Sequence, residues 1–157
     1  MAEYDIAFGK RLSETAHMVA NQGLAELDAQ RTVLYLSLLS TEITLKAMLE
    51  HAGMSVAHTH RLADLISDLG QCEVEIEIVP GSKRHVSASR IRAIPLNHGI
   101  AQSTVGNVID AESQGASKYP TEVRYGEILK HFPAEVVAQM AAEVSIFAHE
   151  HWNDIRK

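Results

Sequence analysis

Residues 25–52, the stretch AELDAQRTVLYLSLLSTEITLKAMLEHA, decide the fold of this chain. Leucines recur along it at the spacing of one helical face, at Leu27, Leu34, Leu38, Leu45 and Leu49. Other apolar residues widen that stripe around the cylinder, and Gly53 supplies a stop. A helix with so broad an apolar surface is usually the central, mostly buried one. We therefore predict a domain built around a long helix over residues 25–52.

Two further stripes on this helix are polar. Small residues cluster on one side, where they would let another helix approach closely: Ser37, Ser40, Thr41 and Thr44. The other stripe is mostly charged and consists of Asp28, Arg31, Tyr35, Glu42 and Lys46. We interpret it as a solvated face with a Glu42–Lys46 pair one helical turn apart. A groove or a dimer contact is the alternative interpretation.

Further helices flank the central one. Helical periodicity predicts a helix over residues 4–22 and a short helix after Thr59, with apolar positions at Leu62, Leu65, Ile66 and Leu69. Pro133 is well placed in a first helical turn and begins a long terminal helix that reaches Ile155. Residues 97–127 are rich in Gly, Ser and polar residues, and only a short helix over 105–112 is expected there.

The periodicity changes to two after Cys72, which indicates a β-hairpin at about residues 72–95. Glutamates alternate with Val74, Ile76 and Ile78, Pro80-Gly81 marks a turn, and the return strand covers residues 83–94. One arm is therefore acidic and the other basic. Cross-strand charge pairing is the simplest interpretation. The alternative is that the arginines of this arm form a local basic patch for binding.

Composition limits the classes of function. The chain has 157 residues and a net charge of -6, so it is one domain of ordinary size without a global basic field for nucleic acid. Cys72 is the only cysteine and no apolar run is long enough to span a membrane, which favours a cytoplasmic protein with no membrane partner. His149 and His151 lie on different sides of a helix, and no glycine-rich phosphate loop occurs. We therefore expect no metal and no cofactor.

Two motifs resemble those of the HEPN family of prokaryotic helical domains. The first is the run of residues 42–49, EITLKAML, at the end of the long helix, and the second is residues 60–65, HRLADL, which open the short helix. Lys118-Tyr119-Pro120 and Arg124-Tyr125 are similar to the aromatic-proline signature that precedes the last helix in one branch of the family. The resemblance implies a single domain over residues 1–157, an up-and-down bundle of four or five helices into which the hairpin is inserted.

The resemblance also implies a homodimer, an association with RNA or nucleotides, and a nucleotidyltransferase partner in a toxin–antitoxin or defence system. Active HEPN ribonucleases are metal-independent and carry Arg followed, four to six residues later, by His. Arg92 with His98 and Arg124 with His131 satisfy that spacing. Neither Ala93 nor Tyr125 is the small polar residue that usually follows the catalytic arginine.

A non-catalytic binding domain for RNA, a nucleotide or a partner protein is therefore the favoured function, and a ribonuclease acting across a homodimer is the alternative. The predicted binding residues are His60, Arg90, Arg92, Lys118, Tyr119, Arg124 and Tyr125. The homodimer is expected to form through apolar surfaces of the long helices.

Overall fold

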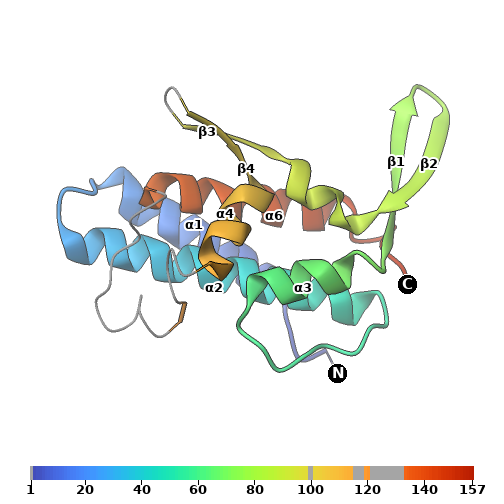
Figure 1. The fold of residues 1–157 in the computed structure, drawn as a ribbon, viewed down its shortest axis with the longest axis horizontal. Coiled ribbons are helices and arrows are strands. Elements are labelled where there is room, and N and C mark those ends of the chain that lie inside the picture. The colour runs from blue at the N-terminus through green and yellow to red at the C-terminus, as the bar shows by residue number, and fades with distance from the viewer. Residues whose placement is uncertain (1, 99–100, 115–118, 121–132) are drawn as a thin grey trace.

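Helices dominate the structure, as predicted, and three long ones form its body (Figure 1). The computed structural model describes residues 2–98, 101–114, 119–120 and 133–157. The long helices are α1 (Ile6–Asn21), α2 (Leu27–His51) and α6 (Ala134–Glu150), and each packs against the other two. Two short helices, α3 (Leu62–Leu69) and α4 (Val105–Ser113), contact each other, and they pack against α2 and α6 respectively.

A β-hairpin projects from this helical body (Figure 1). It consists of β1 (Glu73–Val79) and β2 (Ser82–Ser87), which pair antiparallel. The return strand ends before the predicted Ile94, because the 3-10 helix η1 (Ala88–Ala93) follows β2 and buries Ala88 and Ile91 in the core. A second hairpin that the sequence did not predict pairs β3 (Pro95–His98) with β4 (Ala101–Thr104).

The predicted central helix is confirmed, because α2 carries the largest share of the core. Leu34, Leu38, Leu45 and Leu49 are at most 2% exposed. The apolar residues of α2 form no continuous run of membrane-spanning length, as predicted, but among the described residues α2 is the one helix whose length and mean hydropathy would allow it to cross a membrane. Inside the fold, however, 72% of its most apolar window is buried. That burial is typical of the central helix of a soluble domain.

The small residues of α2 allow α1 to approach closely, as predicted. The Ser40 hydroxyl donates a hydrogen bond of 2.6 Å to the backbone carbonyl of Gly9, which lies on the facing side of α1. A Cβ atom at Gly9 would overlap Oγ1 of Thr44. The absence of a side chain at Gly9 therefore sets how near the two helix axes come.

The charged stripe of α2 is not a solvated face throughout. Asp28 is almost fully exposed, with 95% of its side chain accessible, but Glu42 and Lys46 are buried. The interpretation as a solvated pair is wrong at these two positions, because residues from distant parts of the chain cover them.

The last helix ends earlier than predicted. α6 stops at Glu150, and the residues after it turn back so that Arg156 forms an antiparallel bridge with Glu73 at the base of β1. Trp152 stacks on the imidazole of His51, with 3.9 Å between the ring centroids. The C-terminal residues thus connect the end of α2 to the projecting hairpin.

We expect Gly9→Ala to destabilise the protein by about 1–3 kcal/mol, because the new methyl group overpacks the contact with Thr44. Helix propensity favours alanine by about 1 kcal/mol, which is too little to offset the overlap. The free energy of unfolding in urea measures the effect.

Lys10→Ala, at the next and exposed position, is the control and should change stability by less than about 0.5 kcal/mol. In a Thr44→Ala background the Gly9→Ala penalty should disappear. A penalty that persists there would show that Thr44 is not what limits the approach.

Candidate functional site

A buried carboxylate lies at the centre of the candidate site. Glu42, on α2, has 5% of its side chain exposed, and the ammonium of Lys46 one turn later donates to its Oε1 at 2.8 Å. Removing an ion pair from water costs several kcal/mol unless further hydrogen bonds satisfy both groups. The other contacts of Glu42 supply them.

Two residues from outside α2 donate to the same carboxylate. Nδ1 of His60, just before α3, lies 3.0 Å from Oε1 and 3.1 Å from Oε2 of Glu42. The buried hydroxyl of Tyr119 donates to Oε2 at 2.7 Å. An ionised carboxylate only accepts hydrogen bonds, so these contacts place the hydrogen of the imidazole on Nδ1. We call Glu42, Lys46, His60 and Tyr119 the Glu42 network.

The hydrogen bonds keep Glu42 ionised despite its burial. Burial raises the pKa of this carboxyl, but the hydrogen bonds from Lys46, Tyr119 and His60 and the charge of Lys46 outweigh it and hold the pKa below its ordinary value. The network is therefore an anion with three donors around it.

Aromatic rings lie against the network. The Tyr119 ring lies 6.0 Å from that of Tyr35 and meets His60 edge-on, with 6.3 Å between centroids. The Lys46 ammonium sits 5.2 Å from the ring centroid of Tyr4. Glu50 holds that N-terminal segment in place by accepting the backbone N–H of Glu3 and of Tyr4. His60 alone of the four network residues reaches solvent, with 62% of its side chain exposed.

A second carboxyl lies beside the network. Burial raises the pKa of Glu112, on α4, to about 7, although the backbone N–H of Tyr119 and the charge of Arg61 oppose the shift. Arg61 follows His60 and its side chain is 71% exposed, near enough to Asp64 for a contact of 3.6 Å. The exposed imidazole of His60 and the exposed guanidinium of Arg61 thus adjoin on the surface, close to the buried carboxylate of Glu42 and the partly buried carboxyl of Glu112.

The structure brings some of the predicted site residues together, whereas others lie outside the described residues. It brings His60 and Tyr119 together, although 59 positions separate them in the chain. Lys118, Arg124, Tyr125 and His131 lie outside the described residues, and of His98 only its backbone position in β3 is described. The Glu42 and Lys46 side chains were not predicted to belong to a site, although both occur in the motif of residues 42–49.

The arginines near the hairpin have separate surroundings. A guanidinium nitrogen of Arg92 lies 2.7 Å from both carboxylate oxygens of Asp110, so this side chain joins η1 to α4. Arg90 is exposed and has no ion pair among the described residues. The predicted cross-strand pairing is confirmed for Lys83 and Glu75, whose charged atoms lie 2.9 Å apart.

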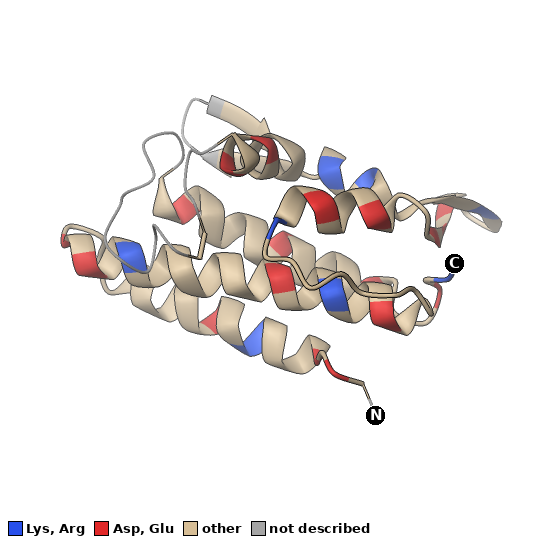
Figure 2. Ribbon diagram, turned by 60° about the horizontal axis from the view of Figure 1, so that its bottom comes forward, with Lys and Arg blue, Asp and Glu red and all other residues tan. Residues whose placement is uncertain are grey.

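The charged residues of the described part of the chain are spread over several elements. Figure 2 shows acidic residues along several helices, with fewer basic residues between them. In residues 2–98, 101–114, 119–120 and 133–157 no group of three or more His, Cys, Asp or Glu side chains could hold a metal ion.

Comparisons of the chain with protein-family models, with curated proteins and with solved structures find no match. Fold and site define a mainly helical domain with a projecting hairpin and a buried carboxylate network. Function must therefore be argued from the physical chemistry of that site.

We expect Glu42→Gln to lower the free energy of unfolding by about 3–5 kcal/mol, because it leaves the Lys46 ammonium buried without its anion. Tyr119→Phe removes one charge-assisted hydrogen bond and should cost about 1.5–3 kcal/mol. The double change Glu42→Leu/Lys46→Met removes both charges and should cost much less than Glu42→Gln. Urea unfolding at pH 7 measures all three, and equal losses for the single and double changes would contradict the buried pair.

Glu112 should make stability depend on pH. Its pKa rises from 4.5 to about 7 on folding, so between these pH values the folded state binds more protons than the unfolded state does. The stabilisation from protonated Glu112 is therefore complete below about pH 4.5 and is lost as the pH rises through 7. Glu112→Gln should therefore stabilise the protein at pH 8 by about 1–2 kcal/mol, after allowance for solvent screening. The gain should vanish below about pH 4.5, and a gain independent of pH would contradict the burial of an ionisable group here.

Proposed function

We propose that this chain is a non-catalytic, HEPN-like binding domain that recognises a phosphate group of RNA or of a nucleotide at His60 and Arg61. The observation that carries the proposal is the fixed position of an exposed histidine. Both oxygens of Glu42 hold Nδ1 of His60, and the ring nevertheless remains largely accessible. A preorganised group loses little freedom when a ligand binds.

The chemistry of the two side chains favours a phosphate. An imidazole whose Nδ1 donates to a carboxylate can gain a proton on Nε2 and then donate to an anion. Among the described residues Nε2 of His60 has no hydrogen-bond partner, and Arg61 adds a planar guanidinium, the donor best matched to phosphate oxygens. Phosphate contacts of this kind bind RNA without reading its sequence.

The alternative ribonuclease has less support from the contacts. Arg92 donates to both oxygens of Asp110, and an arginine engaged in this way would have to break that pair to stabilise a transition state. The pair Arg124 and His131 lies outside the described residues and stays a prediction.

The other predictions from the family resemblance also belong to this proposal. They are a homodimer, a nucleotidyltransferase partner and a toxin–antitoxin or defence role. A cytoplasmic location, which the single cysteine favours, is part of the proposal as well. Phe8 and Met18 support a dimer through a long helix, because both are more than half exposed on α1.

Binding of a fluorescent single-stranded RNA and of ATP, measured by anisotropy and by competition, tests the proposal. Arg61→Ala should weaken binding about tenfold and reduce the dependence on salt by about one counterion. His60→Ala should weaken it similarly. Arg11→Ala is the matched control, because Arg11 is an exposed arginine on α1 that also contacts a carboxylate three residues later.

Equal binding by the wild type and by His60→Ala and Arg61→Ala would reject the site. Cleavage of the RNA by the wild type that is lost in His131→Ala would favour the ribonuclease instead.

A further inference from the structure

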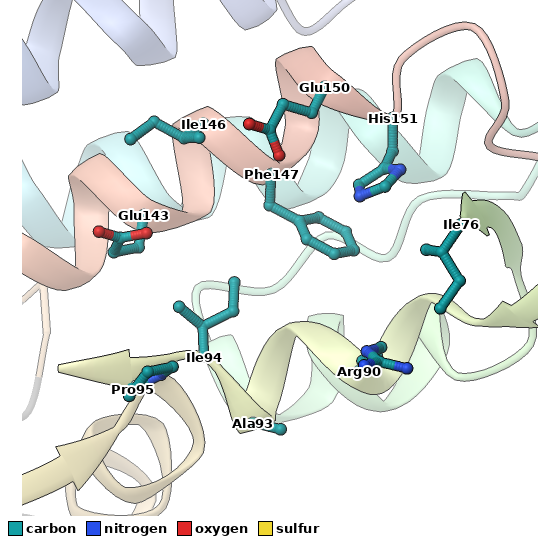
Figure 3. A pocket seen from close by; sticks show the side chains of 10 residues that line it. All are labelled: Ile76, Arg90, Ala93, Ile94, Pro95, Glu143, Ile146, Phe147, Glu150 and His151. Atoms are coloured by element: carbon teal, nitrogen blue, oxygen red, sulfur yellow. The ribbon is translucent and has the colours of Figure 1, made fainter. Parts of the chain in front are cut away.

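A groove runs between α6, η1 and the base of the projecting hairpin, on residues that the proposed phosphate site does not use. It consists of two adjoining cavities of about 390 and 350 Å³ that share Ile76, Glu150 and His151. Figure 3 shows Ile146 and Phe147 of α6 on one side of the first cavity, and Ile94 and Arg90 on the other. We call these two cavities the α6–β1 groove.

The floor of the α6–β1 groove is apolar, and among the described residues part of it is left exposed. Ile76, Ile94 and Phe147 line it, and Ile146 beside them is 49% exposed. Further out on β1, Ile78 is 54% exposed. Covering such apolar surface with an apolar partner gains about 25 cal/mol for each Å² removed from water.

The rim of the α6–β1 groove is negatively charged. Five carboxylates line the two cavities, against the two cations Lys83 and Arg90: Glu75, Glu77, Glu143, Glu150 and Asp154. Lys83 is already paired with Glu75. Glu143, Glu150 and Asp154 have no ion pair among the described residues, so the groove has an excess of negative charge for a cationic partner.

The free edge of β1 determines the shape of that partner. β1 pairs with β2 along one edge, and on its other edge the described residues supply only the bridge from Arg156 to Glu73. From Glu75 outward, this edge has open backbone donors and acceptors. An extended segment from another chain can add to such an edge through main-chain hydrogen bonds.

The side-chain alternation of β1 then sets the pattern of the partner. From Glu75 to Glu77 the side chains alternate between the two faces of the hairpin, so Glu75 and Glu77 share one face and Ile76 lies on the other. A register shift between Glu77 and Val79 ends this regular alternation before Ile78. A strand laid along this edge places successive side chains on the same two faces. Basic residues would meet Glu75 and Glu77, and an apolar residue between them would meet Ile76.

We propose that the free edge of β1 and the α6–β1 groove bind an extended segment of a partner protein in which basic and apolar residues alternate. A second copy of β1 does not fit, because its glutamates would lie opposite those of the first. The contact is independent of the His60–Arg61 surface and stands or falls separately from the phosphate proposal.

A synthetic peptide of about eight residues in which Lys and Val alternate is the probe. Its binding to the full chain is measured by calorimetry at low salt. Glu143→Lys/Glu150→Lys should weaken binding more than about tenfold, because it reverses two charges on the rim, that of the half-buried Glu143 and that of the exposed Glu150. Glu135→Lys, an exposed position at the start of α6 and outside the groove, is the matched control and should bind as the wild type does.

Two further peptides separate strand addition from general charge attraction. A Lys–Val peptide N-methylated at alternate residues keeps its charge but cannot pair along an edge, and it should bind much more weakly. A Glu–Val peptide should not bind. His60→Ala should leave Lys–Val binding unchanged even where it abolishes binding of RNA.

Equal binding of the methylated and unmethylated peptides would overturn the proposal, as would equal binding by the wild type and Glu143→Lys/Glu150→Lys. Self-association of the wild type that blocks the peptide and is lost in the same double variant would also overturn it, in favour of a contact between copies.

Discussion

The carboxylate of Glu42 is the constraint on which the arrangement of this domain depends. A charge in the interior costs several kcal/mol unless it is paired and hydrogen-bonded, and one partner on the same helix does not satisfy its two oxygens. His60 and Tyr119 complete the set from positions 18 and 77 residues further along the chain. The need to satisfy one buried anion therefore fixes the approach to α3 and the segment at Tyr119 against the middle of α2.

The rest of α2 has a different neighbour on each side. Its small face meets α1, where Gly9 and Ser40 are in direct contact, and its leucine stripe lies in the common core. The polar side then remains for the Glu42 network, so the three stripes of one helix correspond to three kinds of packing. The interior end of the network is rigid because Lys46 and Tyr119 are buried, whereas its outer end at His60 is open to solvent. A ligand that binds there meets a side chain whose orientation the core has already set.

Most of the helices could be predicted from the sequence because helical periodicity is a local signal. The long α2, its small face for a neighbouring helix, the short α3 and the acidic arm of the hairpin all follow from spacings of two to four residues. That α1 is this neighbour could not be read from spacing. The burial of Glu42 could not be predicted in this way, because a Glu and a Lys one turn apart have the same spacing on a solvated face and in a core. The partners that distinguish the two cases come from distant parts of the chain. The turn into η1 was missed for a related reason, since Ala88 and Ile91 leave the strand pattern to join a core that the local sequence does not reveal.

The distribution of charge explains how one acidic chain can offer two surfaces of opposite preference. Around His60 the nearest carboxylate, Glu42, is buried and paired, so the exposed atoms there are those of the imidazole, of the neighbouring Arg61 guanidinium and of Asp64, which lies 3.6 Å from that guanidinium. In the α6–β1 groove the carboxylates themselves are at the surface, and two of them flank an exposed isoleucine on α6. At physiological ionic strength charges separated by more than about 8 Å are largely screened, so each surface is governed by its own neighbours and not by the net charge of -6. A polyanion and a cationic strand would therefore be attracted to different parts of the molecule, and binding of one need not displace the other.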